Sequence, residues 1–173
     1  MGYVKLNNED VELGGGFIKQ GNLAMNFVLR NQNLETITLD FFKGKIKVIA
    51  TVPSIDTPVC SQESIALSRL AIAYPDVAFL VVSKDLPFAQ KRFCSHEKIH
   101  NLHFLSDILP ESNFGKDFGV RIESGPLKGL LTRSIYVCDK ADRVTYSELV
   151  EEITQQPDFE SLEKSLKNLQ AEN

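Results

Sequence analysis

Residues 45–64 read KIKVIATVPSIDTPVCSQES, and this stretch decides the fold. Its first part, KIKVIATV, is apolar on both faces, as a central strand covered on both sides would be. Pro58 suits the first turn of a helix, and Pro75 is expected to end that helix. Apolar residues recur between the two prolines at roughly helical spacing: Ile65, Leu67, Leu70 and Ile72. A buried strand that leads directly into a helix predicts an α/β protein with a buried parallel sheet.

The remaining chain alternates between predicted strands and helices. YVKL and VEL flank the polar NNED, so residues 1–16 are predicted to form a β-hairpin and a glycine-rich connector. Further strands are expected at 27–30, 35–39, 76–83 and 102–107, with a pair inside 133–150, and helices at 87–99, 111–120 and 157–170. Periodicity alone predicts an α/β protein with a mixed sheet. The order of elements is that of a thioredoxin-like domain with added N-terminal strands, and we expect one domain over 1–173.

Composition excludes several functions. The chain has 173 residues, of which 43% are apolar, and its 19 basic and 23 acidic residues give a net charge of −4. No basic run is present that would track phosphates, so we expect no nucleic-acid partner. No segment approaches the roughly eighteen apolar residues of a membrane span, and the N-terminus lacks the apolar stretch of a signal peptide. We therefore expect no membrane association.

The chain contains three cysteines, with no CxxC pair. This count indicates neither a secreted disulfide framework nor a structural zinc site, and it suggests the reducing cytoplasm. No nucleotide or phosphate motif is present either, because Gly14 to Gly16 have neither the GxGxxG nor the GxxxxGK[ST] spacing. We expect no cofactor and no metal. In the reducing cytoplasm each of the three cysteines is either a small buried hydrophobe or a reactive thiol.

Cys60 follows the predicted central strand and stands at the head of the predicted helix. Unpaired backbone N–H groups and the positive end of the helix dipole favour a thiolate there. Thr57, on the same turn, can place a hydroxyl beside the sulfur for an incoming oxygen substrate. In the alternative interpretation Cys60 is an ordinary buried cysteine, and Thr57 with Pro58 only caps the helix. The residues alone leave both interpretations open.

Four sequence blocks resemble one family. Pro53, Thr57 and Cys60 stand at the spacing of the peroxiredoxin active-site signature, and SIDTPVC is similar to the version carried by bacterial thiol peroxidases. SKDLPFAQKRFC, ending in Cys94, GPLKGLLTRS, containing Arg133, and EEITQQPDF are similar to further blocks of the same subfamily. The resemblance runs from about residue 20 to the C-terminus. The chain is identified as a member of the atypical 2-Cys peroxiredoxins, and the resemblance implies a thioredoxin-like fold.

The resemblance implies a role for each matching residue. Cys60 corresponds to the peroxidatic cysteine, and Cys94 to the resolving cysteine that joins it in an intramolecular disulfide. Thr57 corresponds to the hydroxyl that positions the peroxide, and Pro53 to the residue that shields the pocket. Arg133 corresponds to the guanidinium that holds the thiolate and the developing negative oxygen. The resemblance also implies hydroperoxide substrates, thioredoxin as the reductant and a homodimer.

Other interpretations of these motifs compete with the resemblance. Taken alone, Arg133 would be a surface charge, and Cys94 would pack its helix with neighbouring phenylalanines. Cys138 departs from the family pattern, which has an aliphatic residue there, and is expected to be structural. Residues 96–100 match the zinc motif HExxH, but no third ligand is marked out. A disulfide oxidoreductase would require CxxC, and a thioredoxin-like binding module would leave Cys60 unreactive, so a peroxidase is the leading prediction.

Overall fold

The computed structural model describes residues 2–172 and contains a sheet of seven strands in the order β10-β9-β5-β6-β7-β3-β4. Its strands are β3 (Val28–Arg30), β4 (Thr36–Thr38), β5 (Lys47–Thr51), β6 (Ala78–Ser83), β7 (His103–Ser106), β9 (Ser134–Cys138) and β10 (Val144–Leu149). β5, β6 and β7 run parallel, whereas β9 lies antiparallel to β5 and β3 lies antiparallel to β7. The predicted mixed sheet is confirmed, with its parallel part at the centre.

A smaller sheet carries the predicted N-terminal hairpin. β1 (Gly2–Leu6) pairs antiparallel with β2 (Glu9–Gly14), and β2 pairs with β8 (Arg121–Ile122). The hairpin turn places Asn7 and Asn8 at φ values of 53° and 70°, which asparagine tolerates better than most residues. β8 was not predicted, because two residues are too short to show an alternating pattern.

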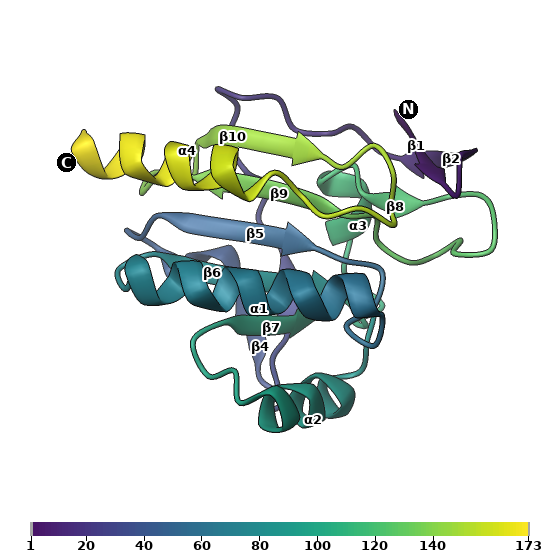
Figure 1. Ribbon diagram of the computed structural model, residues 1–173, viewed down its shortest axis with the longest axis horizontal. Helices are drawn as coiled ribbons and strands as arrows, with labels where there is room; N and C mark the ends of the chain where they lie inside the picture. Colours follow the sequence, from purple (N-terminus) through teal and green to yellow (C-terminus); the bar gives the residue numbers. More distant parts are fainter. Residues whose placement is uncertain (1, 173) are drawn as a thin grey trace.

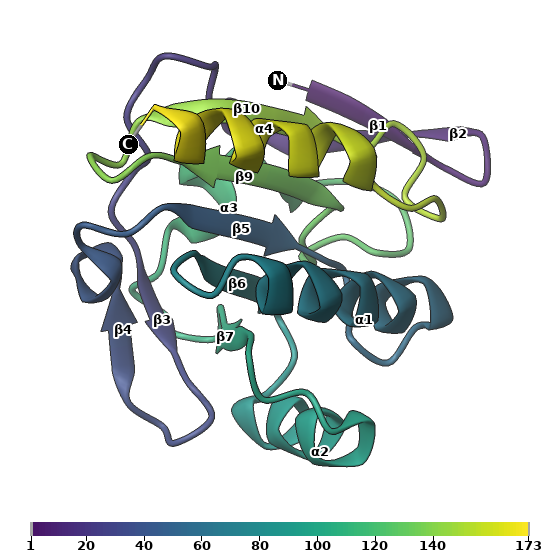
Figure 2. The same ribbon diagram turned by 60° about the vertical axis from the view of Figure 1, so that its left-hand side comes forward.

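The two faces of the large sheet are covered differently. Helices α1 (Pro58–Ala73), α2 (Pro87–Glu97) and α4 (Phe159–Ala171) lie on one face, as Figures 1 and 2 show. The 3-10 helix η1 (Leu39–Phe42) and the short α3 (Phe114–Asp117) pack on the other. Side chains alternate along each strand, so β5 contributes apolar residues to a separate cluster on each face. The sheet is therefore buried on both sides, as its apolar strands predicted. Within residues 2–172, no helix has both the length and the apolar character needed to cross a bilayer.

The buried side of α1 matches the apolar pattern except at one of its four residues. Leu67 is buried, and Ile65 and Leu70 pack against the same cluster, but the Ile72 side chain is 73% exposed. The buried positions are Cys60, Glu63, Ser64, Leu67 and Ala71. Glu63 and Ser64 are polar, so a pattern based on apolar residues alone does not identify them.

The sheet topology brings distant segments to one place. Thr51 at the carboxyl end of β5 pairs with Ser134 at the amino end of β9, because the two strands run antiparallel. The chain leaves β5, passes through the loop 52–57 and enters α1, while Arg133 directly precedes β9. The first turn of α1 and Arg133 therefore meet at the same edge of the sheet, more than seventy residues apart in sequence.

Candidate active site

Cys60 lies in the first turn of α1, and its side chain is fully buried. Thr57 is the N-cap residue, and its Oγ1 accepts a hydrogen bond from the Cys60 backbone N–H at 3.3 Å. The same hydroxyl donates to the Ser54 carbonyl at 3.3 Å. Thr57 therefore caps the helix, and the capping bond also fixes its hydroxyl beside Cys60.

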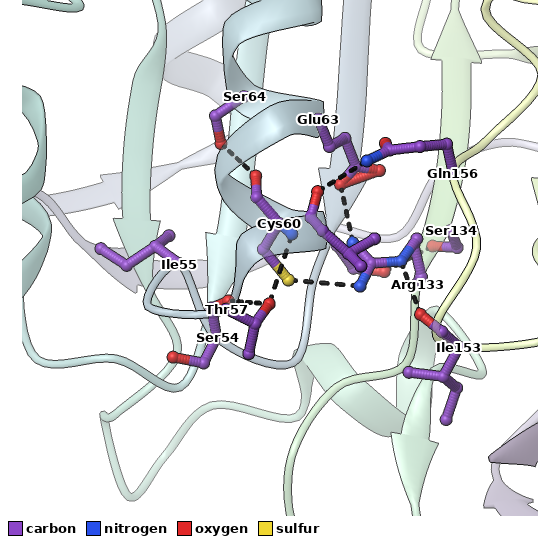
Figure 3. A network of polar contacts seen from close by, with 12 residues as sticks. Ser54, Ile55, Thr57, Cys60, Glu63, Ser64, Arg133, Ser134, Ile153 and Gln156 are labelled. Carbon is purple, nitrogen blue, oxygen red and sulfur yellow. Dashed lines mark hydrogen bonds and ion pairs between the residues drawn. The ribbon is translucent and has the colours of Figure 1, made fainter. Parts of the chain in front are cut away.

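Arg133 is 2% exposed, so it is not the surface charge that its sequence position alone would suggest. Its Nη2 donates to the Cys60 sulfur at 3.3 Å, and its Nε donates to the Ile153 carbonyl at 2.9 Å. Its Nη1 donates to Glu63 Oε2 at 3.3 Å. Figure 3 shows the guanidinium held between these groups, with one nitrogen directed at the sulfur. A fixed, buried cation in this position stabilises negative charge on the sulfur and on an oxygen bound to it.

Glu63 is the buried carboxyl partner of Arg133, with 1% of its side chain exposed. Burial raises the pKa of Glu63 to about 8, while the Arg133 guanidinium opposes that rise. Sequence analysis did not identify this residue. The available signal was its place three residues after Cys60, which puts both side chains on one side of α1.

Two further hydrogen bonds hold the first turns of α1. Gln156 Nε2 donates to the Val59 carbonyl at 2.8 Å, and Ser64 Oγ donates to the Cys60 carbonyl at 3.0 Å. Gln156 reaches the helix from the loop before α4, as Figure 3 shows. It lies in the block EEITQQPDF, but nothing in its own sequence surroundings indicates the contact.

Asp85 connects the loop before α1 with the junction between β6 and α2. Its carboxylate accepts hydrogen bonds from Ser54 Oγ at 2.8 Å, from the Ile55 N–H at 2.9 Å and from Ser83 Oγ at 2.7 Å. Gln90, on α2, donates to the same Ser83 hydroxyl at 3.1 Å. The carboxylate thus ties the loop that carries Thr57 to the start of the helix that carries Cys94. Sequence analysis missed this role as well.

Cys94 lies near the end of α2 and is 5% exposed. It belongs to the same apolar cluster as Cys60, and all three cysteines are free thiols. Gln32 Nε2 donates to the Cys94 sulfur at 3.0 Å.

Pro53 is buried in the loop 52–57, directly before the segment that Asp85 holds. The structure thus brings Cys60, Thr57 and Arg133 together, and it places Cys94 on a neighbouring helix of the same sheet face.

A groove of about 510 Å³ lies between the start of α1 and α2. Thr57, Pro58 and Ile55 line it from the loop and α1, and Ala89 and Phe93 line it from α2. Cys60 is buried and does not line the groove itself, but its N-cap residue Thr57 does. The groove gives a partly apolar molecule a path to the residues that surround the sulfur.

The HExxH motif does not form a helical pair of ligands. α2 ends at Glu97, and Lys98 takes a left-handed conformation with φ 56°, so His100 lies beyond the helix. The two histidines are therefore not one turn apart on a single helical face, which is the geometry that this zinc motif requires. Over residues 2–172, no three His, Cys, Asp or Glu side chains are grouped to hold a metal ion.

Cys138 is fully buried in β9 and faces the cluster on the opposite side of the sheet from Cys60. Burial raises the pKa of its thiol to about 12. It packs beside Tyr136 as a small apolar residue.

Solved structures share this fold and define its class. A peroxiredoxin-like protein from Aquifex aeolicus superimposes with a TM-score of 0.91 at 37% identity, covering 96% of each chain. A thiol peroxidase from Chromobacterium violaceum gives a TM-score of 0.91 at 25% identity, covering 99% of this chain and 98% of that one. The fold is that of the peroxiredoxins.

Sequence relatives narrow the class. The Redoxin family profile matches residues 19–166. A thiol peroxidase from Leptospira interrogans is 40% identical over 157 residues, which cover 90% of this chain and 92% of that protein. A thiol peroxidase from Vibrio cholerae is 39% identical over 163 residues, covering 94% of this chain and 99% of that protein. The chain belongs to the Redoxin family and, within it, to the thiol peroxidases.

Proposed function

We propose that this thiol-dependent peroxidase reduces hydrogen peroxide and organic hydroperoxides with Cys60 as the nucleophile. The contact of Arg133 Nη2 with the Cys60 sulfur at 3.3 Å supports this proposal, since both groups are buried and Cys60 lies in the first turn of a capped helix. The Cys60 thiolate attacks one peroxide oxygen. An S–O bond forms, the O–O bond breaks, and the other oxygen leaves as hydroxide or alkoxide and takes up a proton, which leaves Cys60 as a sulfenic acid.

Arg133 and Thr57 act on the charge that moves in this step. Negative charge passes from the sulfur to the leaving oxygen. A cation fixed beside these atoms stabilises the charge on that oxygen more in the transition state than before the reaction begins. The Thr57 hydroxyl lies beside Cys60 and can exchange hydrogen bonds with the bound peroxide. Pro53, buried in the same loop, shields the pocket.

Cys94 completes the catalytic cycle as the resolving thiol. Its sulfur attacks the Cys60 sulfenic sulfur, an S–S bond forms, the S–O bond breaks, and the oxygen leaves as water. Cys60 lies in the first turn of α1 and Cys94 near the end of α2, so a helix turn must unwind before the sulfurs reach bonding distance. Thioredoxin then reduces the disulfide and restores both thiols.

The groove beside Thr57 supports the proposal that organic as well as inorganic peroxides are substrates, since it combines polar and apolar lining residues.

Leu86 and Phe88, at the start of α2, are 55% and 66% exposed. Large exposed apolar side chains near the groove support a homodimer, which sedimentation at micromolar concentration tests directly. A cytoplasmic location is supported by the low cysteine count, which does not suggest a secreted disulfide framework.

Titration with hydroperoxide tests the first step. One equivalent added to the reduced protein is expected to consume two thiols and one equivalent of peroxide. Cys60→Ser is expected to consume neither, because a hydroxyl does not ionise near neutral pH. Cys138→Ser is the matched control and is expected to react like the wild type. Peroxide turnover by Cys60→Ser would overturn the assignment and point to another nucleophile, whereas a wild type that consumes no peroxide would leave a thioredoxin-like binding module.

A second variant separates the two cysteines. Cys94→Ser is expected to react once with peroxide and then to remain a sulfenic acid or oxidise further, without thioredoxin-driven turnover. In the wild type, peptide mapping is expected to find Cys60 joined to Cys94 within one chain and Cys138 free. Full cycling by Cys94→Ser, or a Cys60–Cys138 bond, would show that the resolving thiol was assigned wrongly.

A further inference from the structure

The sulfur of Cys94 has one hydrogen-bond partner among residues 2–172, the side-chain amide of Gln32. The Nε2 atom of Gln32 lies 3.0 Å from the sulfur. Gln32 is half-buried in the turn between β3 and β4, at the far edge of the sheet from α4. Figure 2 shows this turn and α2 at the same end of the molecule. The contact therefore joins two elements whose sequence positions are 62 residues apart.

The turn that carries Gln32 is held in one conformation by its own hydrogen bonds. Asn31 Oδ1 accepts from the backbone N–H groups of Asn33 and Glu35, both at 2.9 Å. Asn31 Nδ2 donates to the Glu35 carboxylate at 3.1 Å, and Arg30 Nη1 donates to the Leu34 carbonyl at 2.8 Å. Gln32 thus extends from a fixed turn, so the entropy cost of placing its amide against the sulfur is reduced.

Cys94 occupies a position that is unfavourable for a thiolate. It lies near the carboxyl end of α2, where the helix dipole is negative, whereas Cys60 lies at an amino end. Burial raises the pKa of the Cys94 thiol, and the hydrogen bond from Gln32 acts in the opposite direction. Among the described residues the Gln32 amide N–H is the one hydrogen-bond donor to this sulfur, so it is the group that offsets both effects.

We propose that Gln32 activates Cys94 in the resolution step, an inference that rests on the proposed function. Its amide N–H stabilises the Cys94 thiolate that attacks the Cys60 sulfenic acid, so that the S–S bond forms, the S–O bond breaks, and the oxygen leaves as hydroxide and takes up the proton that the Cys94 thiol released, giving water. In the reductive half of the cycle, a thiolate of the reductant attacks the Cys60 sulfur, and Cys94 leaves as a thiolate. The same N–H stabilises that leaving group, since a better-stabilised thiolate leaves faster.

The test begins with the Cys94 thiol alone. In a Cys60→Ser, Cys138→Ser background, the rate of alkylation by iodoacetamide is measured as a function of pH. Gln32→Leu is expected to slow alkylation at pH 7 about tenfold and to move the midpoint to higher pH, because a hydrogen bond to a charged group is lost. Gln32→Glu, of nearly the same shape, places a carboxylate against the sulfur and is expected to move the midpoint further. Asn33→Ala, at an exposed neighbouring position of the same turn, is the matched control and is expected to leave the midpoint in place.

A midpoint that is unchanged or lower in Gln32→Leu would overturn the proposal. An unchanged midpoint would mean that the amide does not stabilise the thiolate, and a lower one would mean that the amide stabilises the neutral thiol. The second measurement is the rate of disulfide formation after one peroxide turnover in protein with all cysteines. Gln32→Leu is expected to slow this rate about tenfold, with the sulfenic acid persisting longer. A raised midpoint with an unchanged rate would also overturn it. A wild type that forms no Cys60–Cys94 disulfide would instead overturn the proposed function, whatever the alkylation experiment shows.

Discussion

Arg133 shows how one side chain can organise a site at the scale of single residues. Its three bonded nitrogens reach the Cys60 sulfur, the Glu63 carboxyl and the Ile153 carbonyl. Only arginine offers several N–H donors in a rigid fork, so a lysine could not satisfy the three partners at once. The orientation of the cation toward the sulfur therefore depends on partners that do not react themselves.

Thr57 gives the first prediction at this scale. Thr57→Val keeps the side-chain shape but removes the hydroxyl beside Cys60, and we expect the second-order rate constant with peroxide to fall about a hundredfold. Thr57→Ser keeps the hydroxyl and is expected to stay within a few-fold of the wild type. Stopped-flow measurement at a temperature where all three proteins are fully folded compares them. Equal rates for the valine and serine variants would show that the hydroxyl only caps the helix.

Glu63 gives a prediction about pH. Burial raises its pKa from an ordinary 4.5 to about 8, so the folded protein keeps a proton that the unfolded chain releases. The stability contributed by this proton is fully present below about pH 4.5 and is lost as pH rises to about 8. We expect the free energy of unfolding of the wild type to fall relative to that of Glu63→Gln over this range, measured by urea titration at several pH values.

The control for this pH dependence is Glu111→Gln, which changes an exposed carboxyl. It is expected to follow the wild type at every pH. Parallel curves for the wild type and Glu63→Gln would contradict the prediction and would mean that Arg133 keeps Glu63 ionised throughout.

At the scale of elements, the first turn of α1 must be both ordered and able to open. The Thr57 cap and the bonds from Gln156 and Ser64 hold the first turns of α1 in their helical conformation. The proposed Cys60–Cys94 disulfide would require some of these bonds to break. They are few and individually worth about 1 kcal/mol each, so local opening is accessible without unfolding of the whole chain.

Asp85 gives the prediction at this scale. Asp85→Ala removes the acceptor for Ser54 Oγ and the Ile55 N–H, so the loop before α1 loses its attachment to the β6–α2 junction. We expect the peroxide rate constant to fall about tenfold or more through misplacement of Thr57, with faster hydrogen exchange over residues 54–60. Asp76→Ala, a change of an exposed aspartate beyond the other end of α1, is expected to alter neither. A lowered rate with unchanged exchange would contradict this account.

At the scale of the whole molecule, we propose that residues 1–173 form one domain. The two main apolar clusters share the strands of the large sheet, and the third joins the N-terminal hairpin to Ile122 and Ile153. Reduced protein is therefore expected to unfold in one cooperative transition. The transition followed by far-UV circular dichroism should coincide with the one followed by the fluorescence of the four tyrosines. Two transitions that do not coincide would show that part of the chain unfolds separately.

Most of the fold could be predicted from the sequence, since its elements have clear local signals. The apolar run of β5, the proline before α1 and the spaced leucines of α4 each indicate an element by periodicity or by a start signal. Two details could not be predicted this way. β8 is too short to show a pattern, and the buried stripe of α1 includes Glu63 and Ser64, which an apolar criterion leaves out.

The sequence by itself determined the order of strands and helices, the place of Cys60 at a helix start and the family that its motifs resemble. Only the tertiary structure decided which polar groups meet that sulfur. Antiparallel pairing of β5 with β9 brings Arg133 to the first turn of α1, where it contacts Glu63, and burial raises the pKa of that carboxyl. Gln32 and Asp85 likewise act across sequence gaps of 62 and about 30 residues. Local propensity cannot encode such contacts, because they depend on how separate elements pack and on where water is excluded.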